Sequence, residues 1–120
     1  MAEHNELGKF GEALAREYLI KKGYIIKKTN WRYGKDEIDI IAQDKDFLVI
    51  VEVKTRSSNY LVEPEFAVTK KKQKFLIRAT EMYINFFDVS CETRFDVISI
   101  IVLPDKNIIK HIEDAFYPTL

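Results

Sequence analysis

The sequence has few of the residues that cross-link small proteins or cradle a nucleotide. Its single cysteine, Cys91, can form no internal disulfide and cannot by itself make a structural zinc site. Its two histidines, His4 and His111, are far apart in the sequence and suggest no ligand set. The four glycines are scattered and form neither a GxGxxG nor a Walker-type loop. These absences exclude a disulfide scaffold, a cysteine-based zinc site and a glycine-loop nucleotide site.

Net charge and long apolar runs are absent as well. Lysine plus arginine balance aspartate plus glutamate at 19 each, so any affinity for nucleic acid must be local. No stretch approaches the roughly 20 apolar residues that span a bilayer, and residues 1–6 do not resemble the start of a signal peptide. We therefore expect a cytoplasmic protein that does not associate with membranes.

The composition present is that of a globular protein. Apolar residues make up 47% of the chain and charged residues 32%. A compact body of this length buries roughly 60 to 70% of its unfolded surface, which is enough for one core. The sequence shows no internal repeat, low-complexity tract or linker, so we expect residues 1–120 to form a single domain.

Apolar spacing and turn residues predict an α/β protein with the element order αβββαββ. The first helix has Asn5 as its expected N-cap and Gly23 as its stop, and the second runs from about Thr69 to Phe87. The first two strands should pair as a hairpin, and the third should lie in the middle of the sheet. A loop is expected from Ser57 to Pro64. The predicted strands are Tyr24–Arg32, Glu37–Ala42, Phe47–Val51, Phe95–Leu103 and Ile108–Ile112.

Basic residues gather in two places. The first third of the chain contains one group, and the predicted second helix carries the other, opposite an expected apolar stripe. Either group can contact phosphates or form an ordinary solvated surface. The first group is Lys27, Lys28, Arg32 and Lys35; the second is Lys70, Lys71, Lys72, Lys74 and Arg78; the stripe is Phe75, Ala79, Met82, Tyr83 and Phe86.

The chemically informative residues lie on the second and third predicted strands. Side chains alternate along a strand, so Glu37 and Asp39 share one face, while Glu52 and Lys54 share a face of the next strand. Earlier in the third strand, apolar residues occupy the face that Glu52 and Lys54 then take over. A core face is therefore expected to become charged at the end of the strand.

Such a pair of acids predicts a cation. Two carboxylates about 4 Å apart repel by roughly 4 kcal/mol at an effective dielectric of 20. Mg²⁺ accepts carboxylate and carbonyl oxygens and several waters, so Asp39, Glu52 and the carbonyl of Val53 are candidate ligands, and Mn²⁺ is an expected substitute. Lys54 would then face the metal-held water or the scissile phosphate. The alternative is an ion pair at a strand end with no ligand.

The first helix offers a further carboxylate, Glu12. Gly8 lies one turn before it and Gly11 directly before it, and each glycine in a helix costs about 1 kcal/mol relative to alanine. Two explanations are open: the glycines admit a phosphate backbone, or they let the helix pack tightly on the sheet.

These residues resemble a known nuclease signature. Asp39, followed after twelve residues by Glu52-Val53-Lys54, is similar to the PD-(D/E)XK motif of restriction-endonuclease-like proteins. A longer series resembles the YraN family, which is uncharacterised as to substrate, and it covers nearly the whole chain. The matching segments are Leu7–Ala13, Gly23-Tyr24, Asn30-Trp31-Arg32, Glu37–Asp39, Val51–Arg56, Lys72, Ala79 and Arg94–Val97.

The resemblance implies a restriction-endonuclease-like fold with a central mixed sheet flanked by helices. The family's likeness to archaeal Holliday-junction resolvases implies a metal-dependent DNA endonuclease for branched or structured DNA, and a homodimer is left open because resolvases of this fold work as dimers. The implied active-site set is Glu12, Asp39, Glu52 and Lys54. Phosphate contacts are expected from Arg32, Arg56, Lys70, Lys71, Lys72, Gln73 and Lys74.

Two positions depart from the pattern. Family members usually have glycine before the Glu-Ile-Asp string, where this chain has Asp36, so the turn before Glu37 is expected to differ. The proline of the motif's name is replaced by Ile38.

Two other functional classes compete with a nuclease. One is a module that binds DNA or RNA without cutting it, and the other is a structural role with a protein partner. A binder gains nothing from two acids beside a phosphate, which favours the enzyme. Exposed aromatic residues have three open roles, namely stacking on bases, an interface, or ordinary packing; the candidates are Trp31, Tyr33, Tyr60 and Phe116.

Overall fold

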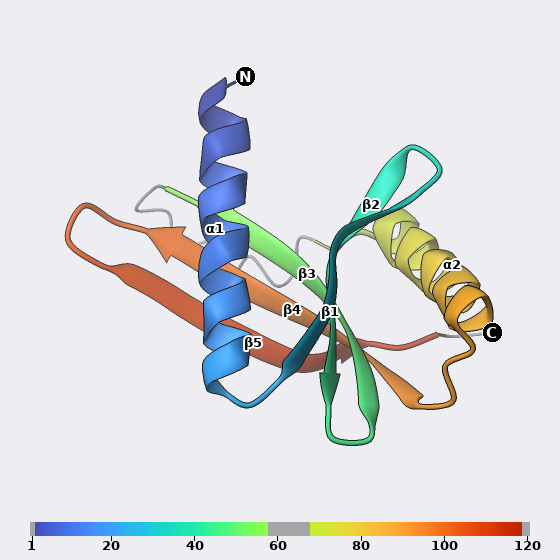
Figure 1. Ribbon diagram of the computed structural model, residues 1–120. Helices are drawn as coiled ribbons and strands as arrows, with labels where there is room; N and C mark the ends of the chain where they lie inside the picture. Colours follow the sequence, from blue (N-terminus) through green and yellow to red (C-terminus); the bar gives the residue numbers. More distant parts are fainter. Residues whose placement is uncertain (1, 58–67, 119–120) are drawn as a thin grey trace.

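The elements of the protein follow one another in the order αβββαββ, as predicted (Figure 1). The computed structural model describes residues 2–57 and 68–118, and for residues 2–5 the backbone alone. The predicted loop from Ser57 to Pro64 lies, apart from Ser57, outside the described residues, as does Tyr60. The elements are α1 (Ala2–Lys21), β1 (Ile25–Tyr33), β2 (Asp36–Asp44), β3 (Phe47–Arg56), α2 (Lys70–Phe87), β4 (Glu92–Val102) and β5 (Asn107–Phe116).

The five strands form one mixed sheet in the order β1-β2-β3-β4-β5. The pair β3–β4 is parallel, and the other three neighbouring pairs are antiparallel. The predicted hairpin of β1 and β2 and the central position of β3 are both confirmed. A parallel pair needs a long crossover, and α2 is the helix in that crossover.

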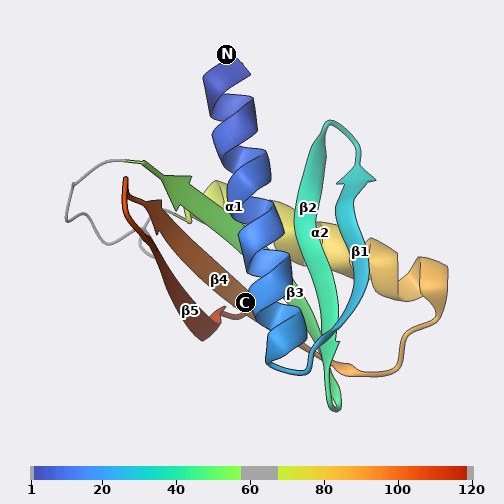
Figure 2. The same ribbon diagram turned by 60° about the vertical axis from the view of Figure 1, so that its left-hand side comes forward.

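The two helices cover opposite faces of the sheet, with α1 in front of it and α2 behind it in Figure 2. On the α1 face, Ala15 and Leu19 are fully buried against the strands. On the α2 face, Leu76, Ala79 and Tyr83 pack against a second set of strand residues. The first strand set is Ile40, Ala42, Val49, Val51, Ile98 and Ile100; the second is Ile38, Ile41, Leu48, Ile50 and Phe95. The sheet therefore has a hydrophobic layer on each side.

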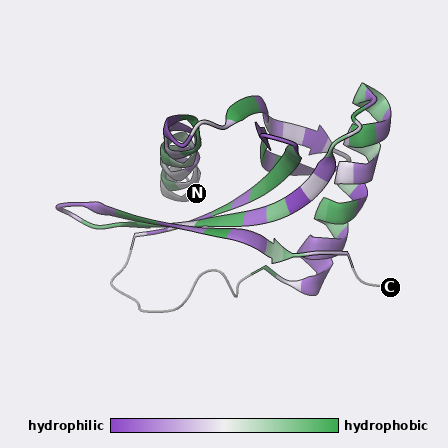
Figure 3. Ribbon diagram, turned by 90° about the horizontal axis from the view of Figure 1, so that it is seen from below, coloured by the Kyte–Doolittle hydropathy of each residue, from purple (hydrophilic) through white to green (hydrophobic). Residues whose placement is uncertain are grey.

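The apolar face of α2 differs from the sequence prediction. The helix carries hydrophobic and hydrophilic residues in alternating bands (Figure 3), and the buried ones include Leu76 and Thr80, neither of which was in the expected stripe. Met82 and Phe86 were expected to be core residues, but they are 44% and 77% exposed. Leu76, Ala79 and Tyr83 recur at three- and four-residue spacing, which turns the adjacent positions toward solvent.

The ends of several elements also differ from the prediction. Helix α1 begins at Ala2, so Asn5 lies inside it and is not its N-cap. Gly23 is confirmed as the stop, because its positive φ of 97° is a conformation that glycine adopts readily. Strand β4 begins at Glu92, earlier than predicted, since the polar Arg94 is buried by pairing with Asp96. Strand β5 extends to Phe116. No helix in the described parts of the chain is long and apolar enough to cross a membrane.

Candidate functional site

Asp39 lies where the central hairpin of the sheet comes apart. The β2–β3 ladder runs from the pair Asp44–Phe47 to the pair Ile40–Val51. Just past that last pair, the Asp39 carboxylate accepts a hydrogen bond from the backbone N–H of Val53, with Oδ2 2.8 Å from the nitrogen. A side chain therefore satisfies a β3 backbone donor at the point where the strands separate.

Glu52 is buried on the α2 face of β3, with 5% of its surface exposed. It follows Leu48 and Ile50 along this face, so the predicted change from apolar to charged residues is confirmed. The Glu52 Oε2 atom lies 3.7 Å from the Lys54 Nζ and 3.9 Å from the Lys72 Nζ. Its Oε1 atom is buried and has no hydrogen-bond partner among the described residues. One carboxylate oxygen is thus neutralised, and the other is left unsatisfied.

The structure brings Asp39 and Glu52 together, as the strand pattern predicted. Burial, next the charge of Glu52, and then the hydrogen bond that a protonated Asp39 makes with Glu52 raise the pKa of Asp39 to about 7, although the Val53 N–H and the Lys72 ammonium act in the opposite direction. Two buried carboxylates this close repel each other when both are charged. A bound proton or a bound cation removes that repulsion.

Glu12 approaches this pair from α1. A Cβ placed on Gly11 would collide with the Thr55 side chain on β3, whereas a Cβ on Gly8 would meet no described atom within 4 Å. Gly11 is therefore explained by close helix–sheet packing, the second of the two explanations, and Gly8 is not explained by contact. This packing sets Glu12 beside the ends of β1 and β2.

Asn30 connects Glu12 to the β1–β2 hairpin. Its Nδ2 donates to Glu12 Oε1 at 2.9 Å and to Glu37 Oε1 at 3.3 Å. The backbone of Asn30 is left-handed, with φ of 49°, a conformation that asparagine tolerates better than most residues. Burial raises the pKa of Glu12 above its ordinary value, with smaller contributions in the same direction from the charges of Asp39 and Glu37. Glu12 is thus part of the same electrostatic cluster.

The donor set fits a hard divalent cation in part. Within residues 2–57 and 68–118, no three histidine, cysteine, aspartate or glutamate side chains come together as a possible ligand set. Mg²⁺ often binds through only one or two carboxylates and keeps several waters, so Asp39 and Glu52 are a sufficient pair. The unsatisfied Glu52 Oε1 is the observation in favour of the cation. Glu12 does not join them as a third direct ligand.

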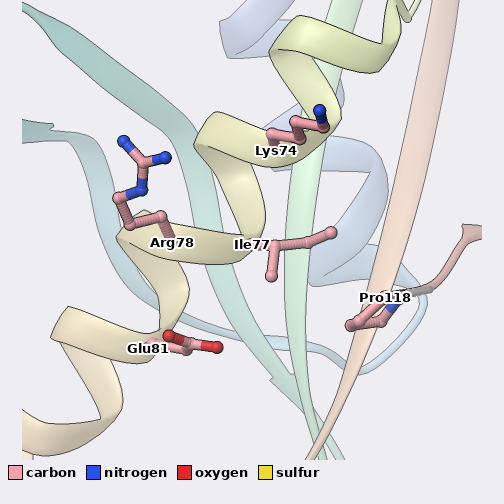
Figure 4. Close-up of a pocket in the computed structure, with 5 residues that line it drawn as sticks. All are labelled: Lys74, Ile77, Arg78, Glu81 and Pro118. Atoms are coloured by element: carbon pink, nitrogen blue, oxygen red, sulfur yellow. The ribbon is translucent and has the colours of Figure 1, made fainter. Parts of the chain in front are cut away.

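The residues predicted to contact phosphates are spread over several environments. Lys70, Lys71 and Lys74 are exposed on α2, as predicted for solvent-accessible cations. Lys74 also borders a hollow of about 280 Å³ beside Arg78 and the C-terminal Pro118 (Figure 4). The hollow lies between α2 and the segment that follows β5, and it is lined in addition by Ile77 and Glu81.

The remaining predicted phosphate contacts are partly engaged within the protein. The Gln73 Nε2 donates to the Val68 carbonyl at 3.1 Å, across the first turn of α2. Arg32 is exposed, and its Nη1 lies 3.4 Å from the Lys35 carbonyl oxygen. Arg56 is half-buried, and its Nε has no hydrogen-bond partner in the described part of the chain. Arg56 therefore keeps an unused donor on the strand that carries Glu52 and Lys54.

Sequence reasoning missed the roles of Asn30 and Lys72 in this cluster. Lys72 was expected to contact phosphate only, but its ammonium lies beside Glu52 because the crossover sets the start of α2 against the end of β3. Asn30 carried a weak signal, since asparagine is one of the few residues that adopt a left-handed backbone.

Comparisons with known proteins agree on one family. The sequence profile described as "Uncharacterised protein family UPF0102" matches residues 11–100. The chain is similar to a UPF0102 protein of Phocaeicola vulgatus, with 47% identity over 120 residues that cover 100% of this chain and 99% of that one. It is also similar to a UPF0102 protein of Flavobacterium psychrophilum, with 51% identity over 117 residues and 98% of each chain covered. The names of these relatives state no activity.

Proposed function

The chain belongs to the uncharacterised protein family UPF0102, the YraN family, and from this premise we propose that it is a Mg²⁺-dependent phosphodiesterase acting on DNA. The proposed substrates are branched or otherwise structured DNA of the kind that arises in repair and recombination. The proposed fold type is that of the restriction endonucleases, in agreement with the αβββαββ order and the mixed sheet.

One observation carries this proposal: a buried carboxylate oxygen without a partner beside a second carboxylate. Glu52 Oε1 is left unsatisfied, and burial together with the charge of Glu52 raises the pKa of Asp39 to about 7. An uncompensated buried polar atom costs free energy, and a protein retains one where a ligand or a reaction uses it. Two neighbouring carboxylates with ammonium groups alongside suit a metal-assisted phosphodiester hydrolysis.

In the proposed mechanism, Asp39, Glu52 and the carbonyl of Val53 would hold a Mg²⁺ ion. The ion, when bound, supplies Lewis acidity to a phosphate oxygen and lowers the pKa of a water. Lys54 lies 3.7 Å from Glu52 and orients the attacking water or offsets negative charge on the phosphate. Lys72 lies 3.9 Å from the same oxygen of Glu52 and would attract the phosphate.

Glu12 and Arg56 complete the proposed site. Burial raises the pKa of Glu12, and the Asn30 amide holds its carboxylate in place, so Glu12 suits a water-mediated position near the metal. Arg56 is half-buried on β3, the strand of Glu52 and Lys54, and its guanidinium group would contact a phosphate oxygen of the bound strand. The exposed Lys70, Lys71 and Lys74 would contact phosphates farther along the DNA.

The test is cleavage by the purified protein with Mg²⁺ or Mn²⁺. Four-way junctions, flaps, single strands and plain duplex are offered in parallel, and at least one branched substrate should be cut. Asp39→Ala should lower the rate about 10³-fold or more, because metal-ion stabilisation is worth several kcal/mol. Lys70→Ala is the control, since an exposed phosphate contact should affect binding and not the chemical step. Intact substrates throughout, or full activity in Asp39→Ala, would contradict the proposal.

A second candidate function is a non-catalytic nucleic-acid-binding module of the same fold. The observation that favours it is that Glu52 is already paired with two lysines, while no third acidic ligand is at hand in the described residues. Such a module would bind DNA equally well in Mg²⁺ and in EDTA, and Asp39→Ala would leave the affinity unchanged. A nuclease would show stronger binding with the metal and lose that gain in Asp39→Ala.

A further inference from the structure

A groove lined mainly by apolar residues lies between the end of β1 and the second half of α2. It has a volume of about 250 Å³ and is lined by Trp31, Arg32, Tyr33, Gly34, Met82 and Phe86. Met82 and Phe86 are exposed, although this helix already has a buried face for the core. Exposed apolar side chains gathered around a hollow mark a binding surface more often than isolated ones do.

The aromatic rings beside the groove contact one another. Trp31 packs edge-on against Tyr83, with ring centroids 5.3 Å apart and an interplanar angle of 88°. Tyr83 contacts Phe87 at 4.6 Å, and Phe87 contacts Phe86 edge-on at 4.9 Å. Trp31 and Tyr33 are half-buried and serve packing as well, so Phe86 is the ring that remains most available to a ligand. The groove therefore offers an aromatic surface.

The charge around the groove selects the kind of ligand. Arg32 is one of its lining residues, and no acidic residue is among them. The Lys28 ammonium lies 5.1 Å from the centre of the Phe87 ring, which places a second cation near the aromatic cluster. A flat apolar group attached to an anion matches this surface. A nucleobase with its phosphate is such a group, and bases stack on exposed aromatic rings without need of a specific sequence.

The groove and the candidate site are built partly on the same two elements, β1 and α2. Asn30 contacts Glu12 and Glu37 with its side chain, while the next residue, Trp31, packs in the cluster on the α2 face. Along α2, Lys72 beside Glu52 and Met82 in the groove are ten residues apart, which is about 15 Å of helix. That length equals about four stacked nucleotides at 3.4 Å each. One strand can therefore reach both places.

We infer that this groove binds one unpaired base of the nucleic acid whose backbone passes the carboxylate pair. The inference rests on the proposed function and narrows its substrate class to nucleic acid with a single-stranded segment next to the cutting position. The unpaired base is expected about four nucleotides from the scissile phosphate.

Fluorescence of 2-aminopurine, a base analogue that is quenched on stacking, tests this inference. The analogue is placed in turn at each position of the single-stranded arm of a flap DNA, and wild-type protein is added in EDTA so that no cutting occurs. Quenching should be strongest at one position. Phe86→Ser should abolish it and weaken binding of the flap about tenfold or more, because one stacked base contributes that much affinity. Binding of plain duplex should be unchanged.

Ile20→Ser is the matched control, since it removes an exposed apolar side chain that is 55% accessible on α1. It should leave both quenching and affinity as in the wild type. Phe86 is 77% exposed, so its replacement should not disturb the core, and urea unfolding of each variant checks this. Met82→Ser provides a second independent variant in the groove.

The possible results separate this inference from the proposed function. Quenching that persists in Phe86→Ser and Met82→Ser, or absence of any binding to flap DNA, would overturn the inference. A change of oligomeric state in these variants, seen by sedimentation with unaltered DNA binding, would overturn it in favour of a second copy as occupant. Groove-dependent quenching without any cleavage in Mg²⁺ would support the inference and contradict the phosphodiesterase. Cleavage in Mg²⁺ without quenching would support the phosphodiesterase and contradict the inference.

Discussion

Two clusters of buried charge occupy different places in the sheet and are completed in different ways. The first contains Asp39 and Glu52, where β2 and β3 separate. The second contains Asp96 and Arg94 on β4, on the face covered by α1, near the end of that helix. In the first, a buried carboxylate oxygen has no hydrogen-bond partner among the described residues. In the second, Asp96 accepts hydrogen bonds from three residues at both of its oxygens.

The second cluster is held by a dense set of contacts. Arg94 donates to Asp96 Oδ1 at 2.9 Å, to Asp96 Oδ2 at 3.0 Å and to the Tyr24 hydroxyl at 2.7 Å. The Lys22 ammonium lies 3.2 Å from His111 Nδ1, and since an ammonium only donates, Nδ1 must be the acceptor. The other ring nitrogen, Nε2, then donates to Asp96 at 2.7 Å. His111 therefore connects Lys22 to Asp96.

The pKa shifts of the two aspartates point in opposite directions. Burial alone would raise the pKa of Asp96, but hydrogen bonds from His111, Arg94 and the Asp114 backbone hold it below its ordinary value. Burial and Glu52 raise the pKa of Asp39 to about 7. A buried carboxylate whose oxygens all accept hydrogen bonds stabilises a fold. A buried carboxylate with an oxygen that lacks a partner lowers the stability of the fold and can bind a ligand at that oxygen. The comparison thus separates a structural cluster from the cluster proposed to be functional.

The largest expected effect is on the structural cluster. Asp96→Asn removes the buried carboxylate that accepts two hydrogen bonds from Arg94, so the free energy of unfolding should fall by about 3 to 5 kcal/mol, measured by urea denaturation. Asp44→Asn is the control: Asp44 also meets Arg94, at 3.3 Å, but is more exposed and should cost at most about 1 kcal/mol. Equal losses of unfolding free energy in the two variants would show that Asp96 is no more important to the fold than Asp44.

The next effect concerns the pH dependence of stability at the functional cluster. The native pKa of Asp39 is about 7 and its ordinary value is 3.8, so between these values the native state keeps a proton that the unfolded chain releases. The contribution of Asp39 to stability therefore falls as pH rises from 4 to 8. In EDTA, Asp39→Asn should gain about 2 to 3 kcal/mol relative to wild type over that window.

Urea denaturation at both pH values measures this gain. Asp46→Asn, which changes an exposed acid in the β2–β3 turn, is the control, and its stability relative to wild type should not rise between pH 4 and pH 8. A constant difference between Asp39→Asn and wild type from pH 4 to pH 8 would contradict the prediction.

A smaller effect is expected where α1 meets the functional cluster. Gly11→Ala forces a Cβ against Thr55, so it should cost about 1 to 3 kcal/mol in urea denaturation and should also slow cleavage by displacing Glu12. Gly8→Ala has open space and should stabilise the protein by about 0.5 to 1 kcal/mol. If both variants behave alike, Gly11 does not set the helix position.

The smallest effect on stability is expected at Glu52 itself. Glu52→Gln keeps the shape of the side chain and leaves two lysines, each 30% exposed, which water can solvate. The free energy of unfolding should therefore change by less than about 1 kcal/mol, while Mn²⁺ binding measured by calorimetry should disappear. A loss as large as that of Asp96→Asn would mean that Glu52 is structural.

The strand pattern of the sequence was sufficient to predict the element order and the meeting of Asp39 with Glu52. Both follow from alternation along β2 and β3, which is a local property. The rotation of α2 was not predictable in the same way, because Met82 and Phe86 are as apolar as the residues that are buried. Only the packing of the helix on the sheet decides which stripe is covered.

The parts of the site that the sequence did not predict depend on distant contacts. Lys72 reaches Glu52 through the crossover, and Asn30 reaches Glu12 because its backbone is left-handed. The early start of β4 was not predicted because Arg94 is charged and charged residues are rarely buried. Arg94 is buried here because Asp96 and Tyr24 accept hydrogen bonds from it. Such pairings have no signature in local spacing.

The parallel pairing of β3 with β4 joins residues that are 45 positions apart, from Phe47–Glu92 to Arg56–Ile101. The other neighbouring strands are joined by short turns. The sheet therefore consists of an antiparallel meander, β1-β2-β3, and an antiparallel hairpin, β4-β5, which the parallel β3–β4 pair joins. Closing so long a loop costs chain entropy before any contact repays it, and this closure should therefore limit the folding rate. Asp39 and Glu52 both belong to the meander, which can form before the hairpin docks.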